Sequence, residues 1–324
     1  MQFNVKQAKR ELIWSKIAIL GPSGSGKTYS ALRMATGMIS RMKEKGVPVG
    51  NGKILVINTE GSRGLYYANE FKYDIINTDE TFPNGNHSPE NYIEALAFAT
   101  KEQYPVCIVD SSSAEWEGKG GCLELHQLAG GNFQSWAKVT PRHDRFIQAL
   151  ANSPMHIIAT MRGKDQYEIE KGDKLNVKKL GVGARQREGF EYEFTSTFSL
   201  DGNFATSQKD NTHLFEVKGR FKISEKDGED IIDWANSGEG YTPKPVPAVV
   251  STDTVVISDE VAEMKKENFV LCTKLKNTEQ KDSMLLLLDK YVPDKKRNPN
   301  LMTNEAEIKA LFGELSELME VVEN

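Results

Sequence analysis

A glycine-rich segment between an apolar strand pattern and a helical pattern places the strongest constraint on the fold of this chain. Residues 17–20 are all apolar, and the segment Gly21–Thr28, GPSGSGKT, follows them directly. Beyond it, apolar residues recur at helical spacing from Ala31 to Ile39. The segment fits G-x-x-x-x-G-K-[ST] in the strand-to-helix context that this phosphate-binding motif requires. The chain is therefore predicted to contain an α/β domain with a nucleotide site at the carboxyl end of a strand.

The residue types in this segment suit a nucleoside triphosphate. Glycines allow successive backbone N–H groups to point at a phosphate, and the following helix contributes the positive end of its dipole. Lys27 is expected to reach the β- and γ-phosphates, and Thr28 is expected to ligate Mg²⁺. The residues predicted to bind ATP are Gly21, Pro22, Ser23, Gly24, Ser25, Gly26, Lys27, Thr28 and Tyr29.

Two further strand patterns end in carboxylates. The apolar run at 106–109 ends in Asp110, which is expected to hold the magnesium shell together with Thr28. The apolar run at 54–57 is followed by Asn58, Thr59 and Glu60. A lone glutamate at a strand end is more often a solvated loop residue. Beside a γ-phosphate, however, it can orient a water molecule and accept its proton.

These elements resemble the RecA-like recombinases, in which a strand ending D-[AT]-E carries the glutamate that polarises the attacking water. INTEGSRG at 57–64 is similar to that strand end, with Asn58 in place of the usual aspartate, and IVDSSSA at 108–114 is similar to the second acidic strand. The resemblance covers about residues 12–237. TMRGK and QREGFEYEF extend it to compact phage-encoded RecA-like ATPases of single-strand annealing and recombination systems. It implies a RecA-like P-loop core, with a mostly parallel central sheet flanked by helices, and a catalytic Glu60.

The same resemblance assigns roles after the strand pattern at 155–160. Thr160 stands where the family has a γ-phosphate sensor, usually Gln or Asn, and Arg162 is a second candidate for that role. Residues 161–190 lie where the family has a mobile DNA-contacting loop. They hold eight Lys or Arg against five Asp or Glu, a pattern that without this context is more typical of a solvated surface. The residues expected to contact DNA phosphates are Arg162, Lys164, Lys178, Lys179, Arg185 and Arg187.

The segment VKGR at 217–220 resembles a family strand that offers two cations to the nucleotide of the neighbouring subunit. Lys218 and Arg220 are therefore expected to act catalytically in trans, within a homo-oligomeric ring or filament. On one continuous strand, the side-chain period of two would place both on the same face. Two exposed strand cations with no such role are the alternative.

Composition narrows the class of protein. A net charge of −5 over 324 residues gives no global basic field, so DNA binding must come from a local patch. The three cysteines are widely spaced, which argues against a disulfide framework. The N-terminus has no apolar signal core, and no apolar run approaches the roughly 18 residues of a membrane span. We expect a cytoplasmic protein (in the host cytoplasm if phage-encoded) without a membrane partner.

Two other motifs carry less weight. Cys122 and His126 are spaced like half a metal site, but no second pair follows, so metal binding there is not expected. Phe146-x-x-Ala149 looks like a recombinase polymerisation motif. It lies within an amphipathic helical pattern and is expected to belong to the core.

The chain is predicted to have an ATPase core at 1–237, a proline-rich linker at 238–257 and a helical C-terminal domain at 258–324. Helices are expected near 258–275, 278–291 and 304–322. Residues 301–324 hold six acids and one lysine, which favours a protein partner over DNA. A small helical domain that packs only on itself is the alternative.

Taken together, these features predict a magnesium-dependent ATPase that binds single-stranded DNA and acts in recombination by annealing or strand pairing. A ring helicase, helicase loader or DNA motor shares the nucleotide site and the trans cations. A nucleotide-gated regulatory or adaptor protein acting through its helical tail is a third reading. The first competitor would separate strands directionally, and the second would hydrolyse ATP independently of DNA.

Overall fold

The computed structural model describes residues 10–171, 175–238, 259–276, 278–292 and 304–323, with a few isolated positions outside these ranges: Phe3, Val5, Gln7, Ala8, Pro299 and Met302. Between 164 and 182, and at 259–262, 265 and 266, the description is limited to the backbone. The chain divides into two compact units, Met1–Val246 and Pro247–Asn324. The division falls within the predicted linker at 238–257, and the domain boundaries themselves stay a prediction.

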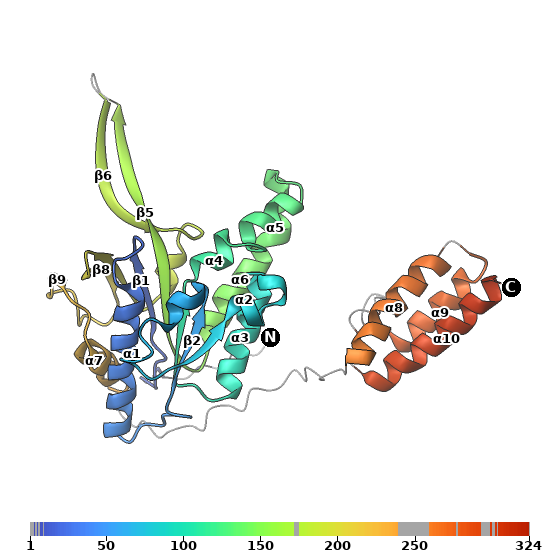
Figure 1. The fold of residues 1–324 in the computed structure, drawn as a ribbon, viewed down its shortest axis with the longest axis horizontal. Helices are drawn as coiled ribbons and strands as arrows, with labels where there is room; N and C mark the ends of the chain where they lie inside the picture. The colour runs from blue at the N-terminus through green and yellow to red at the C-terminus, as the bar shows by residue number, and fades with distance from the viewer. Residues whose placement is uncertain are drawn as a thin grey trace. The chain divides into compact units, whose positions relative to one another are not determined.

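The first unit is built on one twisted, mostly parallel sheet (Figure 1). Among the described residues its strand order is β3-β2-β4-β5-β1-β7-β8-β9, with β6 paired to β5. The strands are β1 (Lys16–Gly21), β2 (Ile54–Asn58), β3 (Asp74–Asn77), β4 (Val106–Asp110), β5 (His156–Lys171), β6 (Leu175–Ala184), β7 (Ser196–Asp201), β8 (Phe204–Asp210) and β9 (Arg220–Phe221). Strands β3, β2, β4, β5, β1 and β7 run parallel, and β6, β8 and β9 pair antiparallel to their neighbours. The predicted α/β fold class, a mostly parallel central sheet flanked by helices, is confirmed.

Helices connect the strands. The α-helices of this unit are α1 (Lys27–Glu44), α2 (Thr78–Thr81), α3 (Pro89–Lys101), α4 (Ser113–Glu117), α5 (Cys122–Leu128), α6 (Trp136–Asn152) and α7 (Glu225–Ala235). The 3₁₀ turns are η1 (Gly61–Leu65), η2 (Pro83–Gly85), η3 (Phe133–Ser135) and η4 (Phe190–Glu193). The glycine-rich stretch after Asp110 therefore contains two short helices and a 3₁₀ turn.

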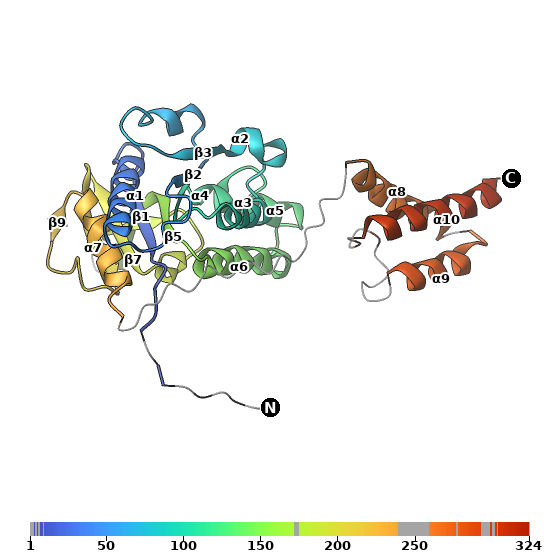
Figure 2. The ribbon, with the colours of Figure 1, turned by 90° about the horizontal axis from the view of Figure 1, so that it is seen from below.

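Both faces of the sheet are covered, which explains the unbroken apolar runs of the parallel strands. Ile17 and Ile19 of β1 belong to a core shared with α1 and α7. Ala18 and Leu20, which alternate with them, belong to a second core shared with α3 and α6. Figure 2 shows these two helix pairs against the sheet. Phe146 is fully buried in the second core, as its helical pattern predicts.

The predicted mobile loop at 161–190 is instead largely an antiparallel hairpin. Strand β5 continues past the sheet to Lys171, and β6 returns beside it, from Leu175↔Lys171 to Ala184↔Gly163, with one irregularity at Gln166/Tyr167. In Figure 1 this two-stranded arm projects beyond the carboxyl edge of the sheet. The loop prediction is wrong because alternating polar residues can pair as a ladder without an apolar face to signal it.

The predicted strand through Lys218 and Arg220 is also wrong. Strand β9 contains only Arg220 and Phe221, and Lys218 lies in the irregular segment before it. Between them Gly219 has a φ of 58°, a left-handed conformation that breaks the extended alternation. The two cations therefore do not share a strand face.

The described residues of the second unit form three helices, α8 (Asp259–Leu275), α9 (Lys281–Tyr291) and α10 (Glu305–Glu323), close to the predicted ranges. Its core includes Leu275, Leu288, Leu311 and Leu315. No helix among the described residues of the chain is long and apolar enough to cross a membrane.

Candidate functional site

A cleft of about 1100 Å³ opens at the carboxyl edge of the sheet. Its walls come from the loop after β1, the ends of β2 and β4, the root of the hairpin and the β7–β8 turn. Of the predicted ATP-binding segment, seven residues line it: Pro22, Ser23, Gly24, Gly26, Lys27, Thr28 and Tyr29. Gly21 and Ser25 are buried behind that surface. Parallel strands gather their carboxyl ends at one edge, which is where ligands bind in open α/β sheets.

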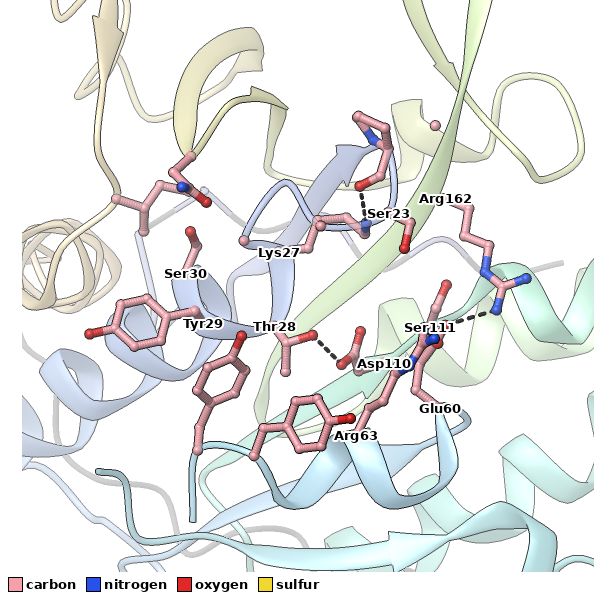
Figure 3. A pocket seen from close by; sticks show the side chains of 18 of the residues that line it. Ser23, Lys27, Thr28, Tyr29, Ser30, Glu60, Arg63, Asp110, Ser111 and Arg162 are labelled. Carbon is pink, nitrogen blue, oxygen red and sulfur yellow. Dashed lines mark hydrogen bonds and ion pairs between the residues drawn. The ribbon is translucent and has the colours of Figure 1, made fainter. Parts of the chain in front are cut away.

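The phosphate loop has the backbone shape that its glycines allow. Gly26 caps α1 with a φ of 82° and a ψ of 19°, and the helix begins at Lys27. Lys27 Nζ donates hydrogen bonds to the carbonyl oxygens of Gly21 at 3.0 Å and Pro22 at 2.8 Å, so it lies across the loop (Figure 3). Burial lowers the Lys27 pKa, and the carboxylates of Asp110 and Glu60 oppose that shift. A bound phosphate would supply this ammonium with a stronger acceptor.

Asp110 is 3% exposed at the end of β4. Its Oδ2 accepts a 2.6 Å hydrogen bond from Thr28, and its Oδ1 accepts one from Thr160. Burial raises the Asp110 pKa, while the two hydroxyl donors act against it. A buried carboxylate beside a hydroxyl oxygen is a donor set that suits Mg²⁺.

Thr160 lies behind Asp110 and not in the cleft. Its side chain is fully buried, it does not line the cleft, and its hydroxyl is engaged by Asp110. The predicted γ-phosphate sensor role of Thr160 is therefore not supported by its position. Arg162, the second candidate, does line the cleft.

Glu60 is delivered to the cleft by a braced turn. Asn58, 1% exposed, accepts the Glu60 N–H at its Oδ1 and donates from Nδ2 to the Gly61 carbonyl at 2.7 Å. Thr59 is joined to the end of β4 by two hydrogen bonds, from its N–H to the Asp110 carbonyl and from the Ser111 N–H to its Oγ1. Asn58 thus shapes the turn, whereas the carboxylate of Glu60 faces the nucleotide site.

The carboxylate of Glu60 is already engaged. Arg162 Nη2 donates to Glu60 Oε1 at 2.8 Å, and Arg63 Nη1 lies 3.5 Å from Oε2 (Figure 3). The side chain of Glu60 is 22% exposed and that of Arg162 is 51% exposed. The hydrogen bond to Glu60 is the main cause of a raised Arg162 pKa. Sequence reasoning placed both residues but did not predict their pairing, because they are 102 positions apart.

The opposite wall of the cleft is formed by residues that were not predicted from the sequence. Tyr66 and Tyr67 line it, and Tyr67 packs edge-on to Tyr29 with ring centroids 5.3 Å apart. These rings offer apolar faces beside the phosphate loop, of the kind that stack on a nucleobase. Arg33, Asn203 and Lys222 also line the cleft. The Tyr-Tyr pair shortly after the strand-end glutamate was the available signal.

Neither predicted trans cation lines the cleft of its own chain. Lys218 Nζ is 2.6 Å from Asp227 Oδ1, and Arg220 Nη2 is 3.4 Å from Asp201 Oδ2. Asp227 is also the acidic member of the capping box that begins α7. Lys218 is therefore held in a structural contact, while the side chain of Arg220 remains 58% exposed.

The predicted DNA-binding residues fall into separate places. Arg162 and Arg185 lie at the root of the hairpin, where the Arg185 N–H donates to the Arg162 carbonyl at 2.7 Å. Arg187 forms a 2.9 Å ion pair with Asp144 and does not line the nucleotide cleft. The remaining predicted contacts have side chains outside the described residues: Lys164, Lys178 and Lys179.

Cys122 and His126 do not face one another as half of a metal site. The ring of His126 stacks on Trp136 at 4.0 Å. Cys122 Sγ instead lies 3.1 Å from Glu115 Oε1, with His143 Nδ1 3.0 Å from the same oxygen. These three side chains are fully buried and close enough to hold a metal ion. The contacts are nevertheless hydrogen-bond distances.

The carboxylate oxygens of Glu115 have hydrogen-bond partners among the surrounding side chains. Gln186 Nε2, at the root of the hairpin, lies 3.1 Å from Glu115 Oε2 and also 3.1 Å from the Ser112 carbonyl. The network joins α4, α5, α6 and the root of the hairpin. Through the Ser112 carbonyl it also connects the root of the arm to the segment that follows Asp110.

Comparisons with known proteins agree with the nucleotide-binding geometry. A family model described as an AAA domain matches residues 15–233, which include the phosphate loop, both strand-end acids and the hairpin. No curated protein matches the sequence. Among solved structures, the chain is similar to the flagellar accessory protein FlaH from Methanocaldococcus jannaschii, at 14% identity over 64% of this chain and 84% of that chain, with a TM-score of 0.33.

Proposed function

The chain belongs to the AAA domain family, and from that premise we propose that it hydrolyses ATP, binds single-stranded DNA and acts as an oligomeric ring or filament in recombination. The proposal that the chain binds DNA is supported by the position of the hairpin root. Arg162 and Arg185, which begin and end the arm, also line the nucleotide cleft. A polyanion bound along the arm would therefore act directly on the residues around the nucleotide.

Different residues of the cleft bind the phosphates, hold the cation and activate the water. Lys27 and the backbone N–H groups of the loop bind the terminal phosphates, and Thr28 with Asp110 would hold Mg²⁺. Bound Mg²⁺ would offset negative charge on the phosphates. Glu60 orients the attacking water and accepts its proton, a role worth about 10²–10⁴ in rate. Tyr66 and Tyr67 would stack on the nucleobase.

Arginine is the cation best suited to the proposed DNA contact. Its planar guanidinium can donate two parallel hydrogen bonds to one phosphate. The side chains of Arg162 and Arg185 are each about half exposed, so each can reach a strand without unfolding its surroundings. The acidic helical unit at the C-terminus would repel that strand, and we propose that it takes a protein partner instead.

The test is an ATPase assay with and without single-stranded DNA, with electron microscopy of the same samples. ATP and Mg²⁺ should raise DNA affinity and promote assembly. Affinity should fall with salt at a slope of roughly −0.7 per phosphate neutralised. Replacing Lys178, Lys179, Arg185 and Arg187 by Ala should flatten that slope.

Other outcomes separate the competing functions. A rate that DNA does not change, with partner binding through the C-terminal helices, would favour a nucleotide-gated adaptor. Directional unwinding of a duplex would favour a helicase or motor. Unchanged affinity and slope in the quadruple variant would move the DNA site away from the hairpin, with the glycine-rich segment at 117–132 next in line.

A further inference from the structure

The buried cluster around Glu115 brings together metal-ligating side chains from three helices. Glu115 of α4, Cys122 of α5 and His143 of α6 are each fully buried, and their ligand atoms lie within 4.8 Å of one another. Cys122 Sγ is 3.1 Å from Glu115 Oε1, while His143 Nδ1 is 3.0 Å from Oε1 and 3.1 Å from Oε2. The cluster therefore offers a sulfur, a nitrogen and both oxygens of one carboxylate.

The negative charge of Glu115 has no lysine or arginine beside it. Among the residues that the structure describes, its ion-pair partner is His143, and the adjacent Arg142 is paired with Glu90 at 2.7 Å. An ionised carboxylate away from water is costly unless a positive charge balances it. A divalent cation held by this carboxylate, a cysteine thiolate and a neutral imidazole would make the cluster electrically neutral. A protonated His143 would balance the charge in a purely hydrogen-bonded cluster.

The thiol of Cys122 favours the cation. A thiol is a weak hydrogen-bond donor, whereas a thiolate is a strong ligand for Zn²⁺. Bonds of roughly 2.0–2.3 Å from a tetrahedral Zn²⁺ place its ligand atoms about 3.4–3.6 Å apart. The observed separations from Glu115 Oε1 would have to widen by only about 0.5 Å to reach that geometry. Thiolate and imidazole together select zinc over magnesium or calcium.

The surroundings of the cluster are those of a closed site. Gln186 Nε2 lies 3.1 Å from Glu115 Oε2, where it would orient the carboxylate as partners of metal ligands commonly do. Aromatic rings lie around His143, with centroid distances of 5.2 Å to Trp116, 6.4 Å to Phe146 and 6.0 Å to Phe190. These rings would exclude water, which suits a structural ion and not a catalytic one.

We propose that Glu115, Cys122 and His143 bind a structural Zn²⁺ ion, which fastens α4, α5 and α6 to one another. The three ligands converge only in the folded chain, so zinc binding stabilises the first unit. The ion holds together the glycine-rich part of the chain between α4 and α6. Its binding requires neither nucleotide nor DNA.

The test uses the full chain, purified under reducing conditions without chelator or nucleotide. Metal analysis should find about one Zn²⁺ per folded chain, because the ion is taken up as the ligands come together. The chain produced with Co²⁺ in place of zinc should show a thiolate-to-cobalt charge-transfer absorption band. That band reports a bond from the metal to sulfur, which the nucleotide site cannot supply.

Cys122→Ser separates a metal site from a hydrogen-bonded cluster. The serine hydroxyl can still donate to Glu115, but it is a poor zinc ligand. The variant should lose the charge-transfer band and bind zinc more than about 100-fold more weakly, beyond the usual effect of changing an outer partner. The matched control is Cys107→Ser, which changes another free, fully buried cysteine of the same unit and should keep both the band and the zinc.

Two further variants test the carboxylate and its partner. Gln186→Ala should weaken zinc binding by about 10–100-fold and keep the charge-transfer band. Glu115→Gln keeps the shape of the side chain and removes its charge, so it should bind no zinc. A strong chelator should therefore lower the Tm of the wild-type chain and leave that of Glu115→Gln unchanged.

A folded wild-type chain that holds neither Zn²⁺ nor Co²⁺, and whose Tm a chelator does not change, would overturn the proposal in favour of a hydrogen-bonded cluster. Zinc held equally well by Cys122→Ser would also overturn it, because the ion would then lie elsewhere. None of these measurements depends on ATP hydrolysis or on DNA binding.

Discussion

Thr28 Oγ1 donates a 2.6 Å hydrogen bond to Asp110 Oδ2, which joins the first turn of α1 to the end of β4. Strand β5 lies between β1 and β4 in the sheet, and Thr160 of that strand donates to the other carboxylate oxygen. The buried carboxylate is therefore fixed in orientation before any cation arrives. Burial raises its pKa, and a divalent cation would favour its ionised form.

Asp110→Asn should weaken the response to magnesium more than the binding of nucleotide. The amide keeps the shape of the side chain but has no charge for the cation shell. Loss of such a supporting group typically costs about 10–100-fold in metal affinity. The Mg²⁺ concentration for half-maximal ATPase should rise by that factor, while ATP binding in EDTA should persist. An unchanged Mg²⁺ titration would remove Asp110 from the magnesium site.

Lys27→Ala and Glu60→Gln should fail at different steps. The first removes the charge that faces the terminal phosphates, so ATP binding should be lost. The second keeps the shape of the side chain but removes the proton acceptor, so ATP should bind and hydrolysis should slow by about 10²–10⁴. Equilibrium binding of a fluorescent ATP analogue and single-turnover hydrolysis separate the two. Wild-type hydrolysis by Glu60→Gln would show that another group activates the water.

We predict that Lys218 and Arg220 act across a subunit boundary, for which Lys218 must leave its contact with Asp227, while the side chain of Arg220 is already exposed. A well-placed cation on the transferred phosphoryl group is worth about 10³–10⁵ in related enzymes. Mixing Lys27→Ala with Lys218→Ala/Arg220→Ala should recover activity, because some interfaces pair a good cleft with good cations. Mixtures shown to co-assemble but remaining inactive would exclude the trans role.

Gly37→Ala and Gly228→Ala should destabilise the first unit, because α1 and α7 touch through backbone at these positions. A Cβ on Gly37 would lie 1.8 Å from the Glu225 carbonyl oxygen, and one on Gly228 would lie 2.0 Å from that of Met34. Overpacking of this kind costs about 1–3 kcal/mol. Gly313→Ala in α10 meets no atom within 4 Å and should stabilise its helix by about 1 kcal/mol. Denaturant titration with a probe in each unit would measure the expected decrease in the free energy of unfolding of the first unit and the expected increase in that of the second.

His156 should make the first unit less stable as the pH falls below neutrality. Burial, and then the neighbouring charge of Lys16, lower its pKa from 6.5 to about 3. Between those pH values the imidazole of His156 is protonated in the unfolded chain and neutral in the folded chain. The free energy of unfolding therefore falls as the pH decreases from 6.5 toward 3, by up to about 1.4 kcal/mol per pH unit.

His156→Asn tests that pH dependence. The ring accepts a hydrogen bond from the Ser15 N–H at Nδ1, and an asparagine oxygen can take that place without titrating. Urea titrations at several pH values from 6.5 down to 5 should give the variant a shallower loss of stability than the wild-type chain. Parallel slopes would assign the pH dependence to other groups.

The sequence was sufficient for the features that depend on local patterns. The phosphate loop follows from glycines between a strand and a helix, and Asp110 and Glu60 follow from apolar runs that end in acids. Parallel strands bring their carboxyl ends to one edge whatever the details of packing, so these residues could be placed together in advance. The fold class follows from the same alternation of strands and helices.

Only the tertiary structure decided which side chains engage one another. Arg162 reaches Glu60, and Thr160 turns to Asp110, because β5 lies between β1 and β4, and no local pattern specifies that order. The hairpin was hidden because its ladder is made by backbone pairing and needs no apolar face. Lys218 lies outside the expected strand because Gly219, in a left-handed conformation, interrupts the extended backbone. Local periodicity determines elements and their ends, whereas contacts between distant residues depend on how the strands are ordered in space.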